Sequence, residues 1–339
     1  MKHMLVGHQR NIRYFERVLV SGAIAHAYLF HGPEGVGKRT IALAVAGALF
    51  CPGNESKGLY GCGRCENCSL AASGSHPDFI ILSPERLLVE EDLKRGPPAG
   101  RAGSPVRRAG IGIKNIHELE RLLALAPWRG GRRIVLIDDA HVLSREAQSA
   151  LLKTLEEPSA ATVFFLITDQ SDAFLPAIRS RCVPMGFTTV SDQDMAPLTA
   201  VLPAARRKLI LEFAAGRPGV AVRLGADAEF FEEFQADQSD FTKVYRAHLG
   251  DQLALSEQAS REPAAAAAFI RRLLLAERAQ LIGSLPAAAA AGERADFIGS
   301  LLDRLMLLES TNVNRRLLMD AIFVELAIRP VLPEAAPAP

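Results

Sequence analysis

Short apolar runs alternate with segments of helical periodicity through the first half of the chain. The run at 133–137, RIVLI, is typical of a strand that is buried on both faces of a parallel sheet. Other segments repeat apolar residues every three or four positions, as helices do. Expected strands cover 27–31, 79–82, 133–137, 162–167 and 183–187, and expected helices cover 9–20, 41–49, 116–125 and 144–155. This alternation predicts a doubly wound α/β domain over residues 1–187.

The pattern is helical throughout after residue 187. A helix over 204–215 ends at Gly216, and Pro218 opens the next helix, which runs to about Leu224. Alanine tracts at 264–268 and 287–291 each follow a proline, and we expect them to be helix starts or linkers. We expect a small helical domain over 188–226, a larger one over 227–330 and a disordered tail over 331–339.

Residues 96–110 interrupt the α/β pattern with glycine, proline and arginine and have no core-forming periodicity. We expect a mobile surface insertion there. Its arginines, Arg101, Arg107 and Arg108, could contact DNA, but a solvated loop is the favoured interpretation.

Composition narrows the class of protein only a little. Of 339 residues, 49% are hydrophobic and 23% charged, and the net charge of +1 gives no overall basic field for nucleic acid. No apolar run approaches the ~18 residues that a membrane span needs. The N-terminus lacks the apolar core of a signal peptide, so we expect a cytoplasmic protein with reduced cysteines and no membrane partner.

A phosphate-binding loop is predicted between the strand at 27–31 and the helix that follows. The pattern G-x-x-x-x-G-K-[ST] supplies backbone N–H groups and a lysine for phosphate and a hydroxyl for the metal. The candidate residues are Gly32, Gly35, Gly37, Lys38 and Thr40. Arg39 stands where the hydroxyl is expected, and Thr40 is turned about 100° away along the helix, so the magnesium ligand is in doubt. A simple glycine turn is the alternative.

Two carboxylates end the strand at 133–137. Asp138 and Asp139 would face the ligand crevice at the carboxyl edge of the sheet. In a phosphate-loop protein the first carboxylate holds Mg²⁺, and a second, usually Glu, can polarise the attacking water. The alternative for Asp139 is a helix or turn cap.

Four of the five cysteines form a cluster in the sequence: Cys51, Cys62, Cys65 and Cys68. The C-x-x-C spacing lets neighbouring thiolates reach one ion, and four filled ligand positions indicate structural Zn²⁺. Free thiols or a redox pair are the alternative.

These motifs together resemble the AAA+ clamp-loader subunits of the bacterial DNA polymerase III holoenzyme. The resemblance is carried by residues 150–158, ALLKTLEEP, by Ser180-Arg181-Cys182 and by the four cysteines. It implies a RecA-like doubly wound parallel sheet, a small helical lid over 188–226 and an all-α collar over 227–330. It also implies that Arg181 is an arginine finger, which acts in trans on a neighbour's nucleotide, and that Thr168 is the first sensor.

Within this family the chain is more similar to the delta-prime type than to the gamma/tau ATPase type. Arg39 replaces the metal-binding hydroxyl, Asp139 replaces the usual Glu, and Gly219 stands where the ATPase has its second sensor arginine. Arg217 and Arg223 are the alternatives for that sensor. The lack of a long lead-in and of a C-terminal extension points the same way.

The resemblance implies a replication role as a holoenzyme subunit without strong ATPase activity of its own. The implied partners are gamma/tau ATPase subunits, the delta subunit, the sliding clamp and, through the complex, primer-template DNA. Whether ATP and Mg²⁺ bind stays open at this point. A competent gamma-type ATPase is the first alternative function, and a zinc-dependent nucleic-acid-binding module is the second.

Overall fold

Two compact units make up the described part of the chain. The computed structural model describes residues 5–54, 58–59, 61–87, 110–129, 131–158, 161–228, 230–232, 247–284, 288–311 and 313–328. One unit contains the described residues up to Val201 together with Ala214–Val222, and the other contains Leu202–Phe213 and the described residues from Arg223 onward. The expected insertion at 96–110, apart from Gly110, and the expected tail at 331–339 lie outside the described residues.

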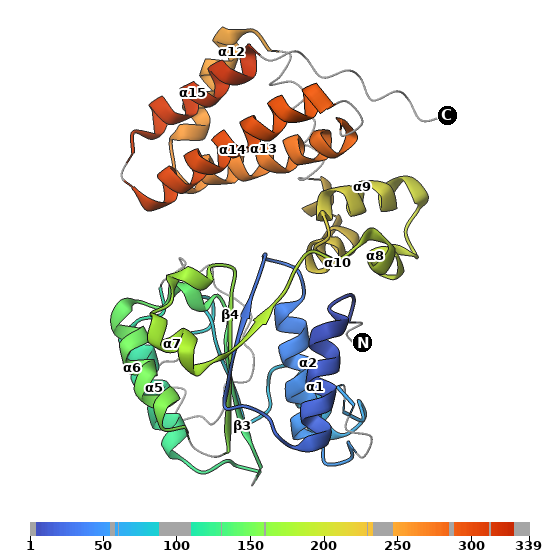
Figure 1. Ribbon diagram of the computed structural model, residues 1–339, viewed down its shortest axis with the longest axis vertical. Coiled ribbons are helices and arrows are strands. Elements are labelled where there is room, and N and C mark those ends of the chain that lie inside the picture. Colours follow the sequence, from blue (N-terminus) through green and yellow to red (C-terminus); the bar gives the residue numbers. More distant parts are fainter. Residues whose placement is uncertain are drawn as a thin grey trace. The chain divides into compact units, whose positions relative to one another are not determined.

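A five-stranded parallel sheet forms the centre of the first unit (Figure 1). Its strands are β1 (Ala27–His31), β2 (Phe79–Leu82), β3 (Arg133–Ile137), β4 (Thr162–Thr168) and β5 (Val183–Gly186). The order across the sheet is β2-β3-β4-β1-β5, and every neighbouring pair is parallel. The doubly wound α/β fold predicted from the sequence is therefore confirmed.

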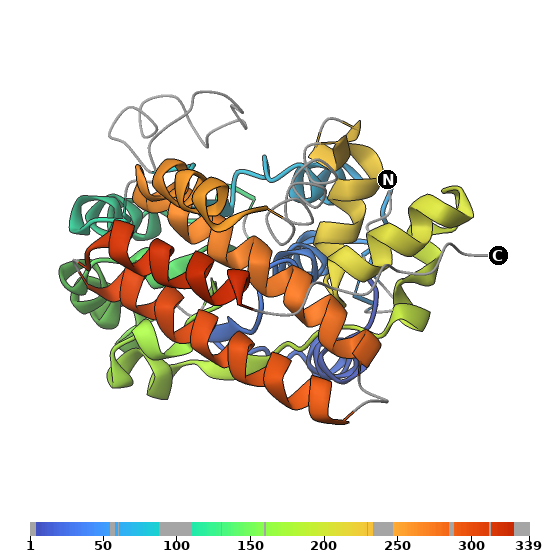
Figure 2. The same cartoon turned by 90° about the horizontal axis from the view of Figure 1, so that it is seen from above.

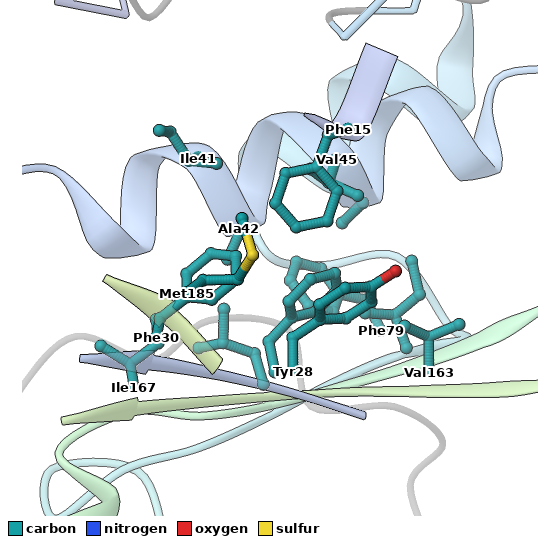
Figure 3. Close-up of a cluster of buried hydrophobic side chains, with 14 of the residues drawn as sticks. Phe15, Tyr28, Phe30, Ile41, Ala42, Val45, Phe79, Val163, Ile167 and Met185 are labelled. Atoms are coloured by element: carbon teal, nitrogen blue, oxygen red, sulfur yellow. The ribbon is translucent and has the colours of Figure 1, made fainter. Parts of the chain in front are cut away.

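Alternation of side chains along the strands gives the sheet two apolar faces. Tyr28 and Phe30 of β1 point to one face, where helices α1 (Gln9–Ser21) and α2 (Lys38–Phe50) cover them (Figure 3). Phe15 of α1 is completely buried and packs against both rings. Each large side chain buried in this way stabilises the fold by about 1.5–3 kcal/mol.

The opposite face is covered by α5 (Ile113–Ala124), α6 (Arg145–Glu156) and α7 (Pro176–Arg181) (Figure 1). Ala27 and Leu29 of β1 point into this second core. The start of α6 is set by Ser144, whose hydroxyl accepts a hydrogen bond from the Ala147 N–H at 3.2 Å.

Several short elements were not predicted from the sequence. They are α3 (Glu66–Ala72), the 3₁₀ turns η1 (Ala140–Val142) and η2 (Ser171–Ala173), α7, and α8 (Asp192–Thr199). They are too short to show a helical period, and α8 also contains Pro197. Ser191 nevertheless caps α8 through the Asp194 N–H at 3.1 Å, so a local start signal was present.

The remaining elements in the described part of the chain are helices. They are α9 (Ala204–Ala214), α10 (Pro218–Ala226), α12 (Leu249–Ser260), α13 (Pro263–Ser284), α14 (Ala288–Ser310) and α15 (Arg315–Ala327). The described residues of both alanine tracts lie at the starts of helices, which is one of the two interpretations given for them above. Within the second unit α13 and α14 lie side by side (Figure 2), and Ile270, Phe297 and Phe323 are in the core that they form with α15. Among the described helices, none combines the length and the apolar character needed to cross a membrane.

Candidate functional site

The loop between β1 and α2 has the backbone of a phosphate cradle. Gly32, Gly35 and Gly37 have φ values of +142°, +76° and +106°, in the region that favours glycine. The constraint is strictest at Gly32, where an added Cβ would lie 2.1 Å from the carbonyl oxygen of Phe187. The loop therefore packs closely against the residue that follows β5, and α2 begins directly after the loop.

Lys38 is the first residue of α2 and is only 7% exposed. Its ammonium group donates hydrogen bonds to the carbonyl oxygens of Gly32 and, at 2.7 Å, Pro33. Burial lowers the pKa of Lys38, and the carboxylates of Asp169 and Asp138 oppose that shift. The lysine is thus folded over the loop as a compact positive charge.

The cradle also contacts the start of α10. The Gly219 N–H donates to the Gly35 carbonyl at 2.7 Å, and a Cβ on Gly219 would lie 2.9 Å from that oxygen. A Cβ on Gly35 would lie 3.7 Å from the Cβ of Arg217. Of the two arginines considered as a second sensor, Arg217 therefore lies beside the loop, whereas Arg223 stacks its guanidinium 3.8 Å from the ring centroid of Phe230.

Asp138 and Asp139 follow β3 at the carboxyl edge of the sheet, as expected. Asp138 accepts a hydrogen bond from Arg39 Nη1 at 2.6 Å, and this ion pair joins residues 99 positions apart. Asp139 has a left-handed backbone, with φ +48°, and precedes η1. Burial raises the pKa of Asp139, and the neighbouring Asp138 carboxylate adds to the increase.

The end of β4 contributes Thr168, which is 1% exposed. Its hydroxyl accepts a hydrogen bond from the Gln170 N–H at 2.9 Å, so it shapes the turn after the strand. The adjacent Asp169 lies 3.2 Å from Nδ1 of His141. Sequence reasoning gave no role to Asp169 or His141, although the position of Asp169 directly after a buried strand was an available signal.

The residues at the expected Mg²⁺ position do not fit that ion. A hydroxyl is missing because Arg39 replaces it, and Asp138, the expected acidic ligand, is already paired with the guanidinium of Arg39. A divalent cation would have to displace the guanidinium of Arg39 from Asp138. It would then still lie close to that positive charge, which repels it. The glycine-rich loop therefore keeps the residues expected of a phosphate cradle, whereas the metal position lacks its hydroxyl and has its carboxylate in an ion pair.

The four clustered cysteines converge on one point. Their sulfur atoms lie within 4.8 Å of one another, and the Sγ–Sγ distances are 4.0 Å for Cys62 and Cys68 and 3.9 Å for Cys51 and Cys65. Tetrahedral zinc with Zn–S bonds of about 2.3 Å places its sulfurs about 3.8 Å apart. The donor set and spacing therefore fit a metal ion with four thiolate ligands.

Two features hold the cysteine cluster in place. Gly61 has φ +59°, and an added Cβ would lie 2.9 Å from Sγ of Cys68, so a side chain there would press on the sulfurs. The Asn67 side chain donates to the Phe50 carbonyl at 2.9 Å and accepts from Arg129 at 2.7 Å. The cluster is consequently tied both to the end of α2 and to the turn before β3.

Arg181 is the last residue of α7. Its Nη2 lies 2.6 Å from Oε1 of Glu156, and its Nη1 donates to the Ala177 carbonyl at 3.0 Å. The side chains of Arg181 and Glu156 are 35% and 49% exposed, so the guanidinium is held at the surface and is accessible.

A parallel sheet in the order β2-β3-β4-β1-β5, with a glycine-rich loop after β1 and carboxylates after β3, is the arrangement of an α/β domain of the AAA+ class. The family model described as "DNA polymerase III, delta subunit" matches residues 7–191, more than half of the chain. The chain therefore belongs to this family.

Individual relatives agree with the family. The chain is 35% identical over 204 residues to the DNA polymerase III subunit delta' of Pseudomonas aeruginosa, covering 59% of this chain and 56% of the relative. It is 33% identical over 179 residues to the DNA polymerase III subunit tau of Salmonella typhimurium, covering 53% of this chain and 24% of the relative. The match thus spans little more than half the length of the delta' relative.

Among solved structures, a DNA polymerase III gamma subunit-related protein from Thermotoga maritima matches with a TM-score of 0.48 at 16% identity. The match covers 93% of this chain and 98% of that protein.

Proposed function

We propose that this chain is a delta-prime-type subunit of the DNA polymerase III clamp loader, which presents Arg181 to a neighbour's nucleotide site and does not hydrolyse ATP itself. The relatives include both delta' and tau subunits at similar identity, so identity alone does not separate the two types. The observation that favours the delta-prime type is the Arg39–Asp138 ion pair, since it removes both expected protein ligands of Mg²⁺.

The proposed partners are the tau/gamma ATPase subunits, the delta subunit, the sliding clamp and, through the assembly, primer-template DNA in the cytoplasm. In this proposal residues 1–187 are the AAA+ domain, residues 188–226 the lid and residues 227–330 the collar that joins the other subunits.

The proposed chemistry of Arg181 is that of an arginine finger. A guanidinium stabilises the charge that builds up on the transferred phosphoryl group, an effect worth about 10³–10⁵ in rate in other systems. In the isolated chain Glu156 neutralises Arg181, but an ion pair this exposed contributes about 0–1 kcal/mol. A neighbour's phosphate can therefore take Arg181 from Glu156 at little cost.

We further propose that the cysteine cluster binds structural Zn²⁺. The sulfur spacing supports this, and four protein ligands leave no open position for catalysis. The fifth cysteine, Cys182, is buried in the apolar core on the other face of the sheet and is outside the cluster.

A competent gamma-type ATPase remains the second candidate because the glycines of the cradle and Lys38 are those that bind phosphate. The ion pair at the metal position counts against it.

The test of the Arg181 role is clamp loading by an assembly that carries Arg181→Ala. Arg179→Ala is the matched control, because Arg179 lies on the same helix and forms a similar surface ion pair, with Asp172 at 3.1 Å. We expect Arg181→Ala to assemble normally and to slow loading at least about tenfold, and Arg179→Ala to load at the normal rate. Normal loading by Arg181→Ala would remove the assigned role.

A further inference from the structure

Arg39 stands at one of the two positions that would hold a divalent cation in a phosphate-binding loop, and it contacts the residue at the other, Asp138. It occupies the sequence position of the metal-binding hydroxyl, and its Nη1 contacts Oδ2 of Asp138 at 2.6 Å. A magnesium ion in such a loop bridges the hydroxyl side and the acidic side and neutralises phosphate oxygens. The guanidinium therefore supplies positive charge at the point where the metal would supply it.

We propose that the guanidinium of Arg39 takes the place of the divalent cation, so that the cradle binds nucleoside di- and triphosphates in their metal-free form. This inference concerns the chain's own cradle. It does not depend on the proposed role of Arg181 toward a neighbour.

The donor capacity of Arg39 suits phosphate oxygens. A guanidinium has five N–H donors and recognises phosphate well. Within the described part of the chain, Asp138 is the one hydrogen-bond partner of the Arg39 side chain, and that side chain is 49% exposed. Several donors thus stay accessible to a ligand in the neighbouring cradle, while Asp138 fixes the position of the group.

The rest of the cradle provides the contacts that do not require metal. Lys38 is a positive charge whose partners are loop carbonyls, and Gly37 leads into the 13-residue helix α2 without a side-chain cap. Backbone N–H groups at such a helix start bind phosphate directly. A second cation beside Arg39 would meet like-charge repulsion, so Mg²⁺ adds nothing to binding.

The experiment is isothermal titration of the full chain with ATP and with ADP, once in excess EDTA and once in excess Mg²⁺. For the wild-type chain we expect saturable binding in EDTA that is equal or weaker in Mg²⁺, because Mg²⁺ sequesters the free nucleotide. Arg39→Ser restores the hydroxyl and frees Asp138. We expect it to bind about tenfold or more tightly in Mg²⁺ than in EDTA.

Arg13→Ser is the matched control, since it removes the same charge from an exposed position on α1 and should behave as wild type. Electron paramagnetic resonance with Mn²⁺ in place of Mg²⁺ gives an independent readout. We expect no protein-bound Mn²⁺ with wild-type chain and nucleotide, and a bound signal with Arg39→Ser. Absence of nucleotide binding to wild type, tighter wild-type binding in Mg²⁺, or bound Mn²⁺ in the wild-type complex would each overturn the proposal.

Discussion

Loss of one cysteine ligand is expected to release the metal and to loosen the packing of the segment around the cysteine cluster. Sγ of Cys65 lies 3.9 Å from Sγ of Cys51 and accepts a hydrogen bond from the Cys68 N–H at 3.4 Å, which caps α3. In Cys65→Ser a hard hydroxyl replaces a soft thiolate, so zinc is held by three ligands and is lost to a chelator.

The magnitude follows from two buried side chains on the segment of the chain that carries the cluster. Leu59 is 1% exposed and Phe50 is 8% exposed, and both belong to the core under α2. Burying a side chain of this size contributes about 1.5–3 kcal/mol. If the segment around the cluster opens and partly exposes both, the free energy of unfolding falls by about 3 kcal/mol, while the sheet keeps its own core.

The assay combines metal analysis with urea denaturation. We expect one zinc per wild-type chain and less than a tenth of that in Cys65→Ser after chelator treatment. Cys182→Ser is the control: it makes the same substitution at a cysteine outside the cluster, and it should keep its zinc. A natively purified wild-type chain without metal, or a Cys65→Ser chain with full metal and unchanged stability, would refute the reasoning.

Two further predictions concern the loop and the surface arginine. Gly32→Ala places a Cβ 2.1 Å from the Phe187 carbonyl oxygen at φ +142°, and it should lower the free energy of unfolding in urea by at least about 3 kcal/mol. Gly47→Ala is the control: a Cβ at this position on α2 would have no atom within 4 Å, so the change should be neutral or stabilising. Equal stabilities of the two variants would contradict the predicted strain at Gly32. Glu156→Gln should change the free energy of unfolding by less than about 1 kcal/mol, because the ion pair with Arg181 is exposed. A loss above about 2 kcal/mol would show that this ion pair stabilises the fold and does not leave Arg181 available.

The sheet was predictable because each strand is indicated by residues that are adjacent in the sequence. The central strands β3 and β4 are runs of mostly apolar residues that are buried on both faces, and the parallel order follows from the helices that separate the strands. The glycine-rich loop between β1 and α2 was predictable for the same reason, since its glycines and Lys38 lie within the short segment 32–38 of the chain.

The pairings across the site were not predictable, because they join residues that are distant in sequence. The sequence shows at Arg39 only that the metal-binding hydroxyl is missing, and the contact of Arg39 with Asp138 depends on how α2 lies against the end of β3. His141 and Asp169 meet because neighbouring strands end at the same edge of the sheet. The roles assigned to Thr168 and Arg181 by resemblance stay predictions, and in this structure their polar atoms satisfy partners within the chain.

The central claim is that this chain retains an arginine for a neighbour's reaction and lacks a working metal site of its own. The most direct measurement is steady-state ATP hydrolysis by the purified full chain alone in excess Mg²⁺, beside a Lys38→Ala chain prepared in the same way. We predict no turnover above the Lys38→Ala background. Clear turnover that disappears in Lys38→Ala would contradict the account and assign the chain to the ATPase type of clamp-loader subunit.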